Sequence, residues 1–246
     1  MSFAAAFESY RDKEKRVEKW VELFLTAVPE QKRGVLLDCG CGVGRFSVPL
    51  ASSFEMVIGI DIDETMLSIA RKRTNDVQWI HGNICCTPLN NDSVDVVLAS
   101  MLIEHLKSFR SFQKEIFRLI KPAGILLMRT MLPEDIAATT WYQFSETAYK
   151  MECSRTHDLA WIVQNMAEYG FVLERNNSVM NVKEYFYNTN IVEKLSSKCY
   201  EIIHHLEEKE YQRMLTNAKK WEMENHMPEC MSSSLLVFTQ EKKTND

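Results

Sequence analysis

The sequence has no apolar run long enough to cross a bilayer as a helix, which takes about 20 residues. Its two most apolar windows, 94–103 and 123–132, are short and contain Asp95 and Arg129. The N-terminus also lacks the basic start and the long apolar core of a secretion signal. We therefore expect a cytoplasmic protein that makes no contact with the membrane.

No run of basic residues is dense enough to follow a phosphate backbone, and the formal net charge is −5 at pH 7. Neutralisation of phosphates supplies much of the affinity of proteins for nucleic acid. Nucleic acid is therefore a disfavoured partner. Two short basic stretches, near 11–19 and 71–73, are the only support for a tRNA or protein substrate.

Clusters of cysteine and histidine at the spacing of zinc ligands are also missing. The seven cysteines are an odd number, with Cys39 and Cys41 on either side of Gly40 and the pair Cys85 and Cys86 further along. We interpret them as reduced thiols, the usual state in the cytoplasm. We predict no metal site.

Repeats and low-complexity tracts are absent, and 246 residues with 46% hydrophobic content suit one domain with its own core. Apolar residues recur at helical spacing over 3–28, which predicts an N-terminal cap helix over 1–28. Beyond it, apolar runs alternate with helical patterns, which predicts an α/β fold with a mostly parallel sheet and helices on both faces. The expected strands are 35–39, 56–61, 77–81, 94–100, 124–131, 171–180 and 235–239, and the expected helices are 45–53, 64–73, 109–120 and 158–169.

Two segments do not fit this alternation. Residues 132–157 have the composition of a loop rich in bulky side chains, including Trp141 and Tyr142, and residues 181–233 continue as helix after Tyr185. A connection that leaves a parallel strand starts at its carboxyl end, where ligands bind. We expect both segments to form a lid and an acceptor pocket. The alternatives are a helical dimer interface or a plain packing layer.

The most informative stretch is an apolar run that ends in Asp38 and is followed by Gly40, Gly42 and Gly44. Strand, glycine turn and helix together bring bare backbone close to a nucleoside ligand. A second apolar run ends in Asp61, 23 residues after the first acid. This offset is close to the one at which an acidic side chain meets a bound ribose.

Two kinds of phosphate site are excluded by the same residues. A dinucleotide turn needs a further glycine where this sequence has Arg45, and Asp38 would repel a pyrophosphate. The Gly-Lys-Ser/Thr of a P-loop is missing. A cationic ligand without phosphate, such as S-adenosylmethionine, suits the residues better. Its sulfonium and ammonium favour a nearby carboxylate, and its ribose hydroxyls suit Asp61 as an acceptor.

At this point the sequence resembles the class I S-adenosylmethionine-dependent methyltransferases, over about residues 34–131. Residues 38–44 resemble the first motif of that family, 59–62 the second, 81–84 the end of the third strand, 94–106 the fourth strand and its exit, and 117–127 the fifth strand with the helix before it. The resemblance implies a Rossmann-like sheet of seven strands whose last strand is antiparallel, and S-adenosylmethionine as cofactor.

The resemblance also implies roles for individual residues. The cofactor-binding candidates are Tyr10, Asp38, Gly40, Gly42, Asp61, Ile62, Asn83, Ile84 and Ser100. Asp61 would accept hydrogen bonds from the ribose hydroxyls, Ile62 would lie against the adenine, and Asn83 would face its amino group, where the family commonly has Asp. Three of these residues have an alternative role. Asp61 could cap a helix, Asn83 could be a turn residue, and Tyr10 could belong to a helix packed on the side of the domain.

On the acceptor side, His105 is the candidate general base, since imidazole titrates near pH 6.5. The alternative is that His105 packs behind the cofactor. Arg129 could bind an acceptor carboxylate or neutralise an acid of the lid. Trp141, Tyr142 and Tyr185 complete the predicted acceptor site.

We therefore predict an S-adenosylmethionine-dependent methyltransferase, monomeric or homodimeric, that methylates O, N or C of a small-molecule metabolite. One alternative is a methyltransferase that acts on tRNA or protein. Another is a protein that binds the cofactor without methylating, which the lack of an unambiguous base leaves open.

Overall fold

The computed structural model describes residues 16–174, 179–187, 190–224 and 227–241. The chain divides into two compact units. Among the described residues, unit 1 comprises 131–158, 181–187, 190–224 and 227–234, and unit 2 comprises 16–130, 159–174, 179–180 and 235–241. Both segments that do not fit the strand–helix alternation, 132–157 and 181–233, fall within unit 1. No helix in the described part of the chain is long and apolar enough to cross a membrane.

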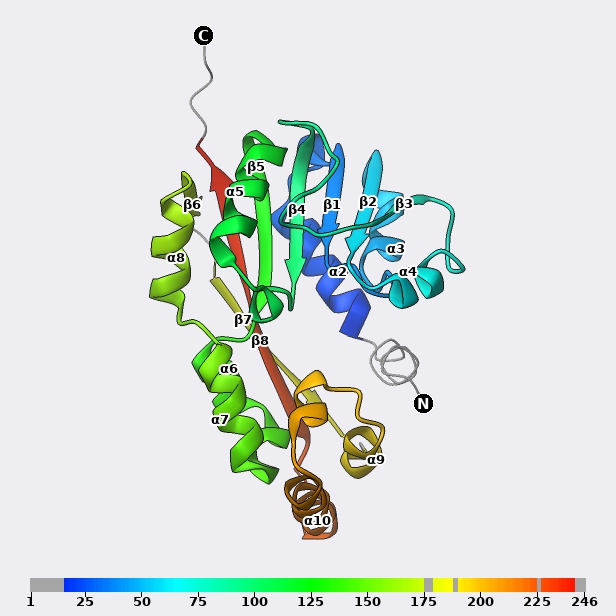
Figure 1. Ribbon diagram of the computed structural model, residues 1–246, viewed down its shortest axis with the longest axis vertical. Coiled ribbons are helices and arrows are strands. Elements are labelled where there is room, and N and C mark those ends of the chain that lie inside the picture. The colour runs from blue at the N-terminus through cyan, green and yellow to red at the C-terminus, as the bar shows by residue number, and fades with distance from the viewer. Residues whose placement is uncertain (1–15, 175–178, 188–189, 225–226, 242–246) are drawn as a thin grey trace. The chain divides into compact units, whose positions relative to one another are not determined.

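In the described part of the chain the sheet has eight strands, and its main path runs β3-β2-β1-β4-β5-β8-β6 (Figure 1). The strands are β1 (Val35–Cys39), β2 (Met56–Asp61), β3 (Val77–His81), β4 (Val94–Ser100), β5 (Ile120–Thr130), β6 (Phe171–Leu173), β7 (Val179–Phe186) and β8 (Glu229–Gln240). The pairs β1–β2, β1–β4, β2–β3 and β4–β5 are parallel, and β6–β8 is antiparallel. The expected mostly parallel sheet with an antiparallel last strand is confirmed.

The eighth strand comes from a segment that was expected to be one strand. The expected strand 171–180 ends as β6 at Leu173, and a separate strand, β7, begins at Val179 and pairs with β8. β8 is also longer than the expected 235–239, because it begins at Glu229. Its residues up to 234 belong to unit 1 and the rest to unit 2.

Five α-helices of the described chain belong to unit 2: α2 (Arg16–Ala27), α3 (Ser47–Leu50), α4 (Glu64–Ala70), α5 (Phe109–Leu119) and α8 (Leu159–Ala167). In Figure 1, α5 lies in front of the sheet and α2 behind it. α5 begins where the Ser108 side chain accepts the Ser111 N–H, and its buried stripe includes Phe112 and Ile116. These helices cover β-strands whose apolar residues are almost fully buried, as the residues of β4 from Val96 to Ala99 are.

Unit 1 is more helical than the sequence suggests, and the expectation of a loop over 132–157 is wrong. Three helical segments occupy it: α6 (Pro133–Ala138), the 3₁₀ helix η4 (Thr140–Phe144) and α7 (Glu146–Arg155). Pro133 at the first turn of α6 is compatible with a helix start, and Ser145 caps α7 by accepting the Ala148 N–H. After β7 follow α9 (Ile191–Ser196), the 3₁₀ helix η5 (Glu201–His205) and α10 (Glu208–Glu224).

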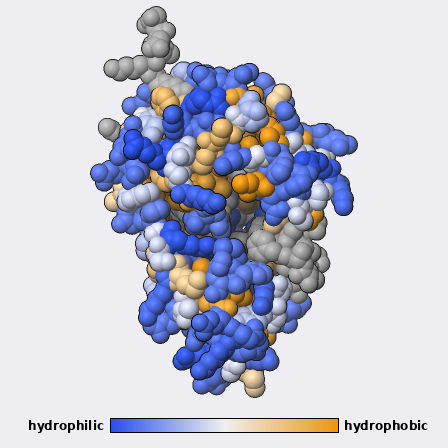
Figure 2. Space-filling view, in the orientation of Figure 1, coloured by the Kyte–Doolittle hydropathy of each residue, from blue (hydrophilic) through white to orange (hydrophobic). Residues whose placement is uncertain are grey.

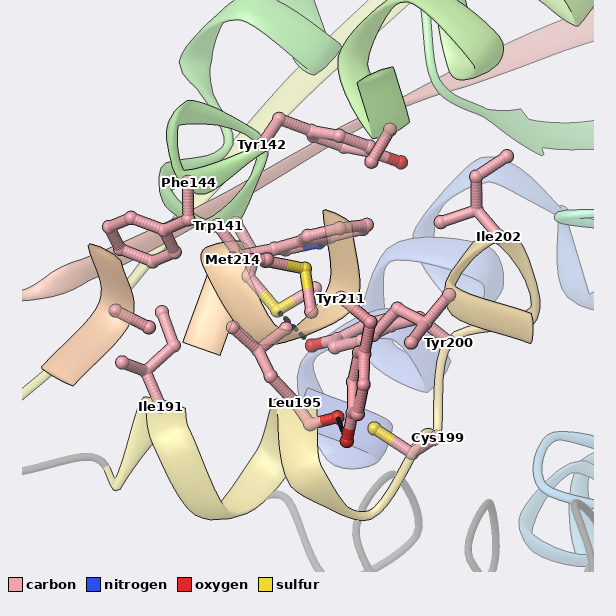
Figure 3. Close-up of a cluster of buried hydrophobic side chains, with 14 of the residues drawn as sticks. Trp141, Tyr142, Phe144, Ile191, Leu195, Cys199, Tyr200, Ile202, Tyr211 and Met214 are labelled. Atoms are coloured by element: carbon pink, nitrogen blue, oxygen red, sulfur yellow. Dashed lines mark hydrogen bonds between the residues drawn. The ribbon is translucent and has the colours of Figure 1, made fainter. Parts of the chain in front are cut away.

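A stack of three aromatic rings forms the centre of unit 1 (Figure 3). The Trp141 indole lies 4.0 Å from the Tyr142 ring and 5.0 Å from the Tyr200 ring, with interplanar angles of 28° and 20°. Both faces of the indole are therefore covered by protein. Residues of α9 and α10, including Leu195 and Met214, close the cluster.

A buried carboxylate joins the parts of unit 1. Asp135 accepts hydrogen bonds from the Ser232 and Ser234 hydroxyls, the Asn181 amide and the Leu132 N–H. These donors come from β8, β7 and the residue before α6. Asp135 is fully buried, and these donors provide the hydrogen bonds that a buried carboxylate needs. On the face drawn in Figure 2, hydrophilic residues dominate and hydrophobic ones gather in small groups.

Candidate cofactor site

The carboxyl ends of β1 and β2 meet at one edge of the sheet, as they must in a parallel pair. Asp38 is paired with Gly59, and Cys39 with Ile60. The chain turns immediately after β1, where the N–H groups of Gly40 and Cys41 both donate to the Ile60 carbonyl, at 2.8 and 3.1 Å. The glycine turn is thus tied to the end of β2.

The three glycines of the turn have left-handed backbones, with φ of +67° at Gly40, +55° at Gly42 and +76° at Gly44. A Cβ at Gly40 would lie 2.8 Å from the Leu102 side chain, and one at Gly44 would lie 2.6 Å from the Trp79 ring. At Gly42 no described atom lies within 4 Å of that position. Gly40 and Gly44 are therefore required for packing, whereas Gly42 borders open space.

Asp61 links the end of β2 to this turn. One carboxylate oxygen accepts the Gly42 N–H at 2.7 Å, and the other accepts the Asp63 N–H at 2.9 Å. Each oxygen keeps one further acceptor position, because a carboxylate oxygen can accept two hydrogen bonds. Capping of α4 belongs to Asp63, whose side chain accepts the N–H groups of Thr65 and Met66. The helix-cap alternative for Asp61 is therefore wrong.

Asp38 is 2% exposed and accepts a hydrogen bond of 2.5 Å from the Ser47 hydroxyl. Burial raises the pKa of this carboxyl to about 7, Asp61 adds repulsion, and the hydrogen bonds from Ser47 oppose both. Since the pKa in the folded state lies above the usual value, protonated Asp38 stabilises the fold at acidic pH. That contribution is lost as the pH rises through about 7. A bound cation would favour the ionised form.

The residues predicted to contact adenine come directly after β2 (Ile62) and shortly after β3 (Asn83 and Ile84). Ile62 is 71% exposed, which is unusual for a large apolar side chain directly beside an acid. Asn83 follows β3, is exposed, and accepts the Cys85 N–H through its side-chain oxygen at 2.9 Å. Ile84 is buried. Asn83 is thus a turn residue, and its contact with adenine stays a prediction.

Ser100 and Arg129 lie at the ends of β4 and β5 and are register partners. Arg129 is buried, donates to the Ser100 hydroxyl at 3.3 Å, and has its guanidinium carbon 4.2 Å from the centre of the Trp20 ring. Met101 follows with a φ of +53° and donates its N–H to the Arg129 carbonyl at 2.7 Å. His105 is exposed in the short 3₁₀ helix η3 (Ile103–His105).

The remaining candidates lie in unit 1 or outside the described residues. Trp141 and Tyr142 are in the aromatic stack, and burial raises the pKa of the Tyr142 phenol well above its usual value. Tyr185 is 56% exposed on β7. Tyr10 is outside the described residues. The structure thus brings Asp38, Gly40, Gly42 and Asp61 to one edge, and acceptor binding by the aromatic residues stays a prediction.

Sequence reasoning missed Ser47 and Trp79. Ser47 begins α3 and bonds Asp38. The Trp79 ring lies under both Gly44 and Gly59, 2.6 Å from the place that a Cβ would take at either glycine. Neither Ser47 nor Trp79 has a spacing signal of its own, because both act through residues that are distant in sequence. All seven cysteines are free thiols, and no three metal-ligating side chains converge within the described ranges.

A separate groove of about 570 Å³ lies along α2, and none of the predicted cofactor residues lines it. Its walls are Val17, Val21, Leu25 and Pro49, with Glu18, Glu22, Thr26 and Arg33 completing the lining. Arg33 itself donates to the Leu25 and Val28 carbonyls at the end of α2. The groove is therefore a feature of the α2 surface and has no part in the glycine turn.

Comparison with known proteins agrees with this geometry. Residues 37–128 match the family described as Methyltransferase domain. A probable S-adenosylmethionine-dependent methyltransferase of Mycolicibacterium smegmatis is 39% identical over 95 residues, which are 39% of this chain and 37% of that protein. Residues 37–128 are therefore similar to the methyltransferase domain of S-adenosylmethionine-dependent enzymes. The match to the relative thus spans little more than a third of its length.

Other matches extend beyond the methyltransferase domain. The malonyl-[acyl-carrier protein] O-methyltransferase of Yersinia pestis is 30% identical over 131 residues, 53% of this chain and 49% of that protein. A solved structure of a putative methyltransferase from an antibiotic biosynthesis pathway of Anabaena variabilis matches with a TM-score of 0.69 at 15% identity, covering 90% of this chain and 96% of that one. At that identity the structural match shows a shared fold.

The residues at the turn of the methyltransferase domain fit its cofactor. Gly42 borders open space, each Asp61 oxygen retains an acceptor position, and the Asp38 carboxyl provides a buried acid for a cationic group. The exposed Ile62 offers an apolar surface beside them.

Alanine at two glycines of the turn should have different effects, mainly on stability at Gly44 and mainly on cofactor binding at Gly42. Gly44→Ala is expected to lower the free energy of unfolding by about 2 to 4 kcal/mol, because the methyl group meets Trp79 on a left-handed backbone. Gly42→Ala should cost only about 1 to 2 kcal/mol of backbone strain but weaken S-adenosylhomocysteine binding at least ~10-fold, by filling the open space. Urea denaturation and calorimetry measure the two effects. Equal affinity of Gly42→Ala and wild type would contradict the cofactor position.

Proposed function

We propose that the protein transfers a methyl group from S-adenosylmethionine to a small-molecule acceptor, at O, N or C. The proposal rests on the hydrogen bond that links the turn after β1 to the end of β2. The Asp61 carboxylate is fixed by Gly42 and Asp63, beside a glycine with nothing described within 4 Å of its Cβ position. The match of residues 37–128 to the methyltransferase domain supports the same chemistry.

In this proposal S-adenosylmethionine supplies the electrophilic methyl group when bound. Asp61 holds the ribose, Asp38 offsets positive charge, and the Gly40 and Gly42 backbone allows close approach. Ser100 and Arg129, joined at 3.3 Å, form the ends of β4 and β5 beyond this turn. Methyl transfer needs positioning and exclusion of water above all, and a base only where the acceptor arrives protonated. His105 is our candidate for that base.

We further propose that 132–157 and 181–233 supply the acceptor pocket. They fold together into unit 1, with an aromatic core and an exposed Tyr185. A small acceptor is favoured over nucleic acid by the net charge of −5. The O-methyltransferase named above acts on malonyl-acyl carrier protein by its description, so a thioester-bound small acid belongs to the acceptors to be tested. Seven free thiols support a cytoplasmic location.

Methyl-labelled S-adenosylmethionine tests the proposal directly. The protein is incubated with a cell extract split into a dialysable fraction and a macromolecular fraction, and labelled products and S-adenosylhomocysteine are quantified. We expect label in the dialysable fraction with equimolar S-adenosylhomocysteine. Label that remains in tRNA or protein after hydroxylamine cleavage of thioesters would favour the alternative acceptors. Cofactor binding without product from any fraction would favour a protein that does not methylate.

A further inference from the structure

We propose that Ser47 is a positioning residue of the cofactor site: its hydroxyl orients the Asp38 carboxyl and favours the charged form of that group when a cationic cofactor binds. The inference rests on the proposed function, because it concerns the same ligand. It adds a residue that no motif of the sequence marks and gives that residue a measurable effect on binding.

The geometry around Asp38 carries the inference. Ser47 is fully buried, and its hydroxyl donates to one Asp38 carboxylate oxygen at 2.5 Å. The Ser47 main chain also acts on this carboxyl and lowers its pKa. The glycine turn brings the two residues together: Gly44 donates to the Cys41 carbonyl at 2.9 Å, and α3 starts three residues later with Ser47.

Among the described residues, no charged or titratable group that acts on Asp38 lowers its pKa. Asp61 at the end of β2 raises the Asp38 pKa by repulsion. On β1 and in the turn, the Cys39 and Cys41 thiols have pKa values raised by burial and also by Asp38 itself, so both remain neutral. In the ligand-free protein, Ser47 is thus the group that lowers the Asp38 pKa against burial and repulsion.

Removal of the Ser47 hydroxyl therefore has a predictable sign. Without it the Asp38 pKa rises from about 7 to a higher value, and more of the carboxyl is neutral at pH 7. If the pKa becomes ~8, the ionised fraction at pH 7 falls from about half to about one tenth, a roughly fivefold loss. At pH 9 nearly all of the carboxyl is ionised in both proteins, so the loss should vanish.

The experiment is calorimetric titration of the full chain with S-adenosylmethionine at pH 6, 7, 8 and 9. It compares wild type, Ser47→Ala, Asp38→Asn and the control Ser52→Ala. Ser52 is a nearby exposed serine whose hydroxyl bonds the Pro49 carbonyl. The ratio of variant to wild-type affinity at each pH removes the titration of the ligand itself. A second measurement, carboxyl NMR of the ligand-free proteins, follows the Asp38 titration without any ligand.

We expect Ser47→Ala to bind about fivefold more weakly than wild type at pH 7 and within twofold of it at pH 9. Ser52→Ala should match wild type throughout, and Ser47→Ala should have a raised Asp38 pKa in the NMR titration. In Asp38→Asn the affinity should lose its rise between pH 6 and 8. A Ser47→Ala protein weakened by the same factor at every pH, or not at all, overturns this inference alone. A wild-type protein that binds no S-adenosylmethionine at any pH overturns the proposed function together with it.

Discussion

Trp141→Ala is expected to lower the free energy of unfolding by about 3 to 5 kcal/mol, the range for removal of a buried Trp. Trp141 is 2% exposed, and it is stacked between Tyr142 and Tyr200, at 4.0 and 5.0 Å. The truncation removes both ring contacts and leaves a cavity that the helices around it can only partly fill. Urea denaturation followed by near-ultraviolet circular dichroism reports the loss.

Two variants of α10 calibrate that measurement. Trp221 packs against the edge of the same cluster, 5.8 Å from the Phe144 ring, so Trp221→Ala should cost only about 1 to 2 kcal/mol. Met223 is 84% exposed, and Met223→Ala should stay within about 0.5 kcal/mol of wild type. A loss below about 1 kcal/mol for Trp141→Ala would mean that the stack does not hold unit 1 together.

Asp61→Asn is expected to weaken S-adenosylhomocysteine binding by about 1 to 3 kcal/mol, which is roughly 5- to 150-fold. The variant keeps the size of the side chain but loses its charge and one acceptor oxygen. The two oxygens accept the Gly42 and Asp63 N–H groups, so the bonds to the turn and the proposed bonds to the ribose weaken together. Isothermal titration calorimetry gives the affinity.

Asp63→Asn is the matched control, two residues away on the same strand exit. Asp63 caps α4, and Asn is as good a helix cap as Asp, so stability and affinity should both stay close to wild type. If Asp61→Asn retains wild-type affinity while Asp63→Asn behaves as expected, the assignment of the ribose acceptor is wrong. A loss in both variants would point to the turn as a whole.

The parallel part of the sheet could be predicted from the sequence nearly to the residue. β1, β2, β3 and β4 have the expected bounds, because each is a short, mainly apolar run that ends at, or is followed by, a polar or glycine residue. β5 begins at Ile120, before the expected 124, through a register shift between Val94 and Val96. Such a bulge depends on pairing with a neighbour and leaves no periodic signal in its own strand.

Unit 1 was harder to predict because its helices are short and broken. η4 and η5 are 3₁₀ segments of five residues each, and α7 has no clear apolar stripe: its buried residues are only Ala148 and Glu152. The Glu152 carboxylate is held by Arg155 in a two-point ion pair, at 3.2 and 3.0 Å. From the sequence alone, a buried Glu–Arg pair on a helix cannot be distinguished from charged residues on a solvent-exposed helix face.

At the site, sequence reasoning identified residues that carry their own motif and missed those that act through others. Asp38, Gly42 and Asp61 were found from spacing, and the structure places them together at one strand edge. Either Asp61 or Asp63 could cap the following helix by sequence alone, and in the structure Asp63 caps it while Asp61 accepts the Gly42 N–H, a contact across 19 residues. Ser47 is recognisable only once the turn has brought it to Asp38.

The measurement that tests the central claim most directly is a crystal structure of the protein with S-adenosylhomocysteine bound. We predict density for the ribose within hydrogen-bond distance of both Asp61 carboxylate oxygens, with the ligand passing over Gly42 and the adenine against Ile62. Well-defined ligand density elsewhere, with the space beside Gly42 filled only by water, would contradict the account.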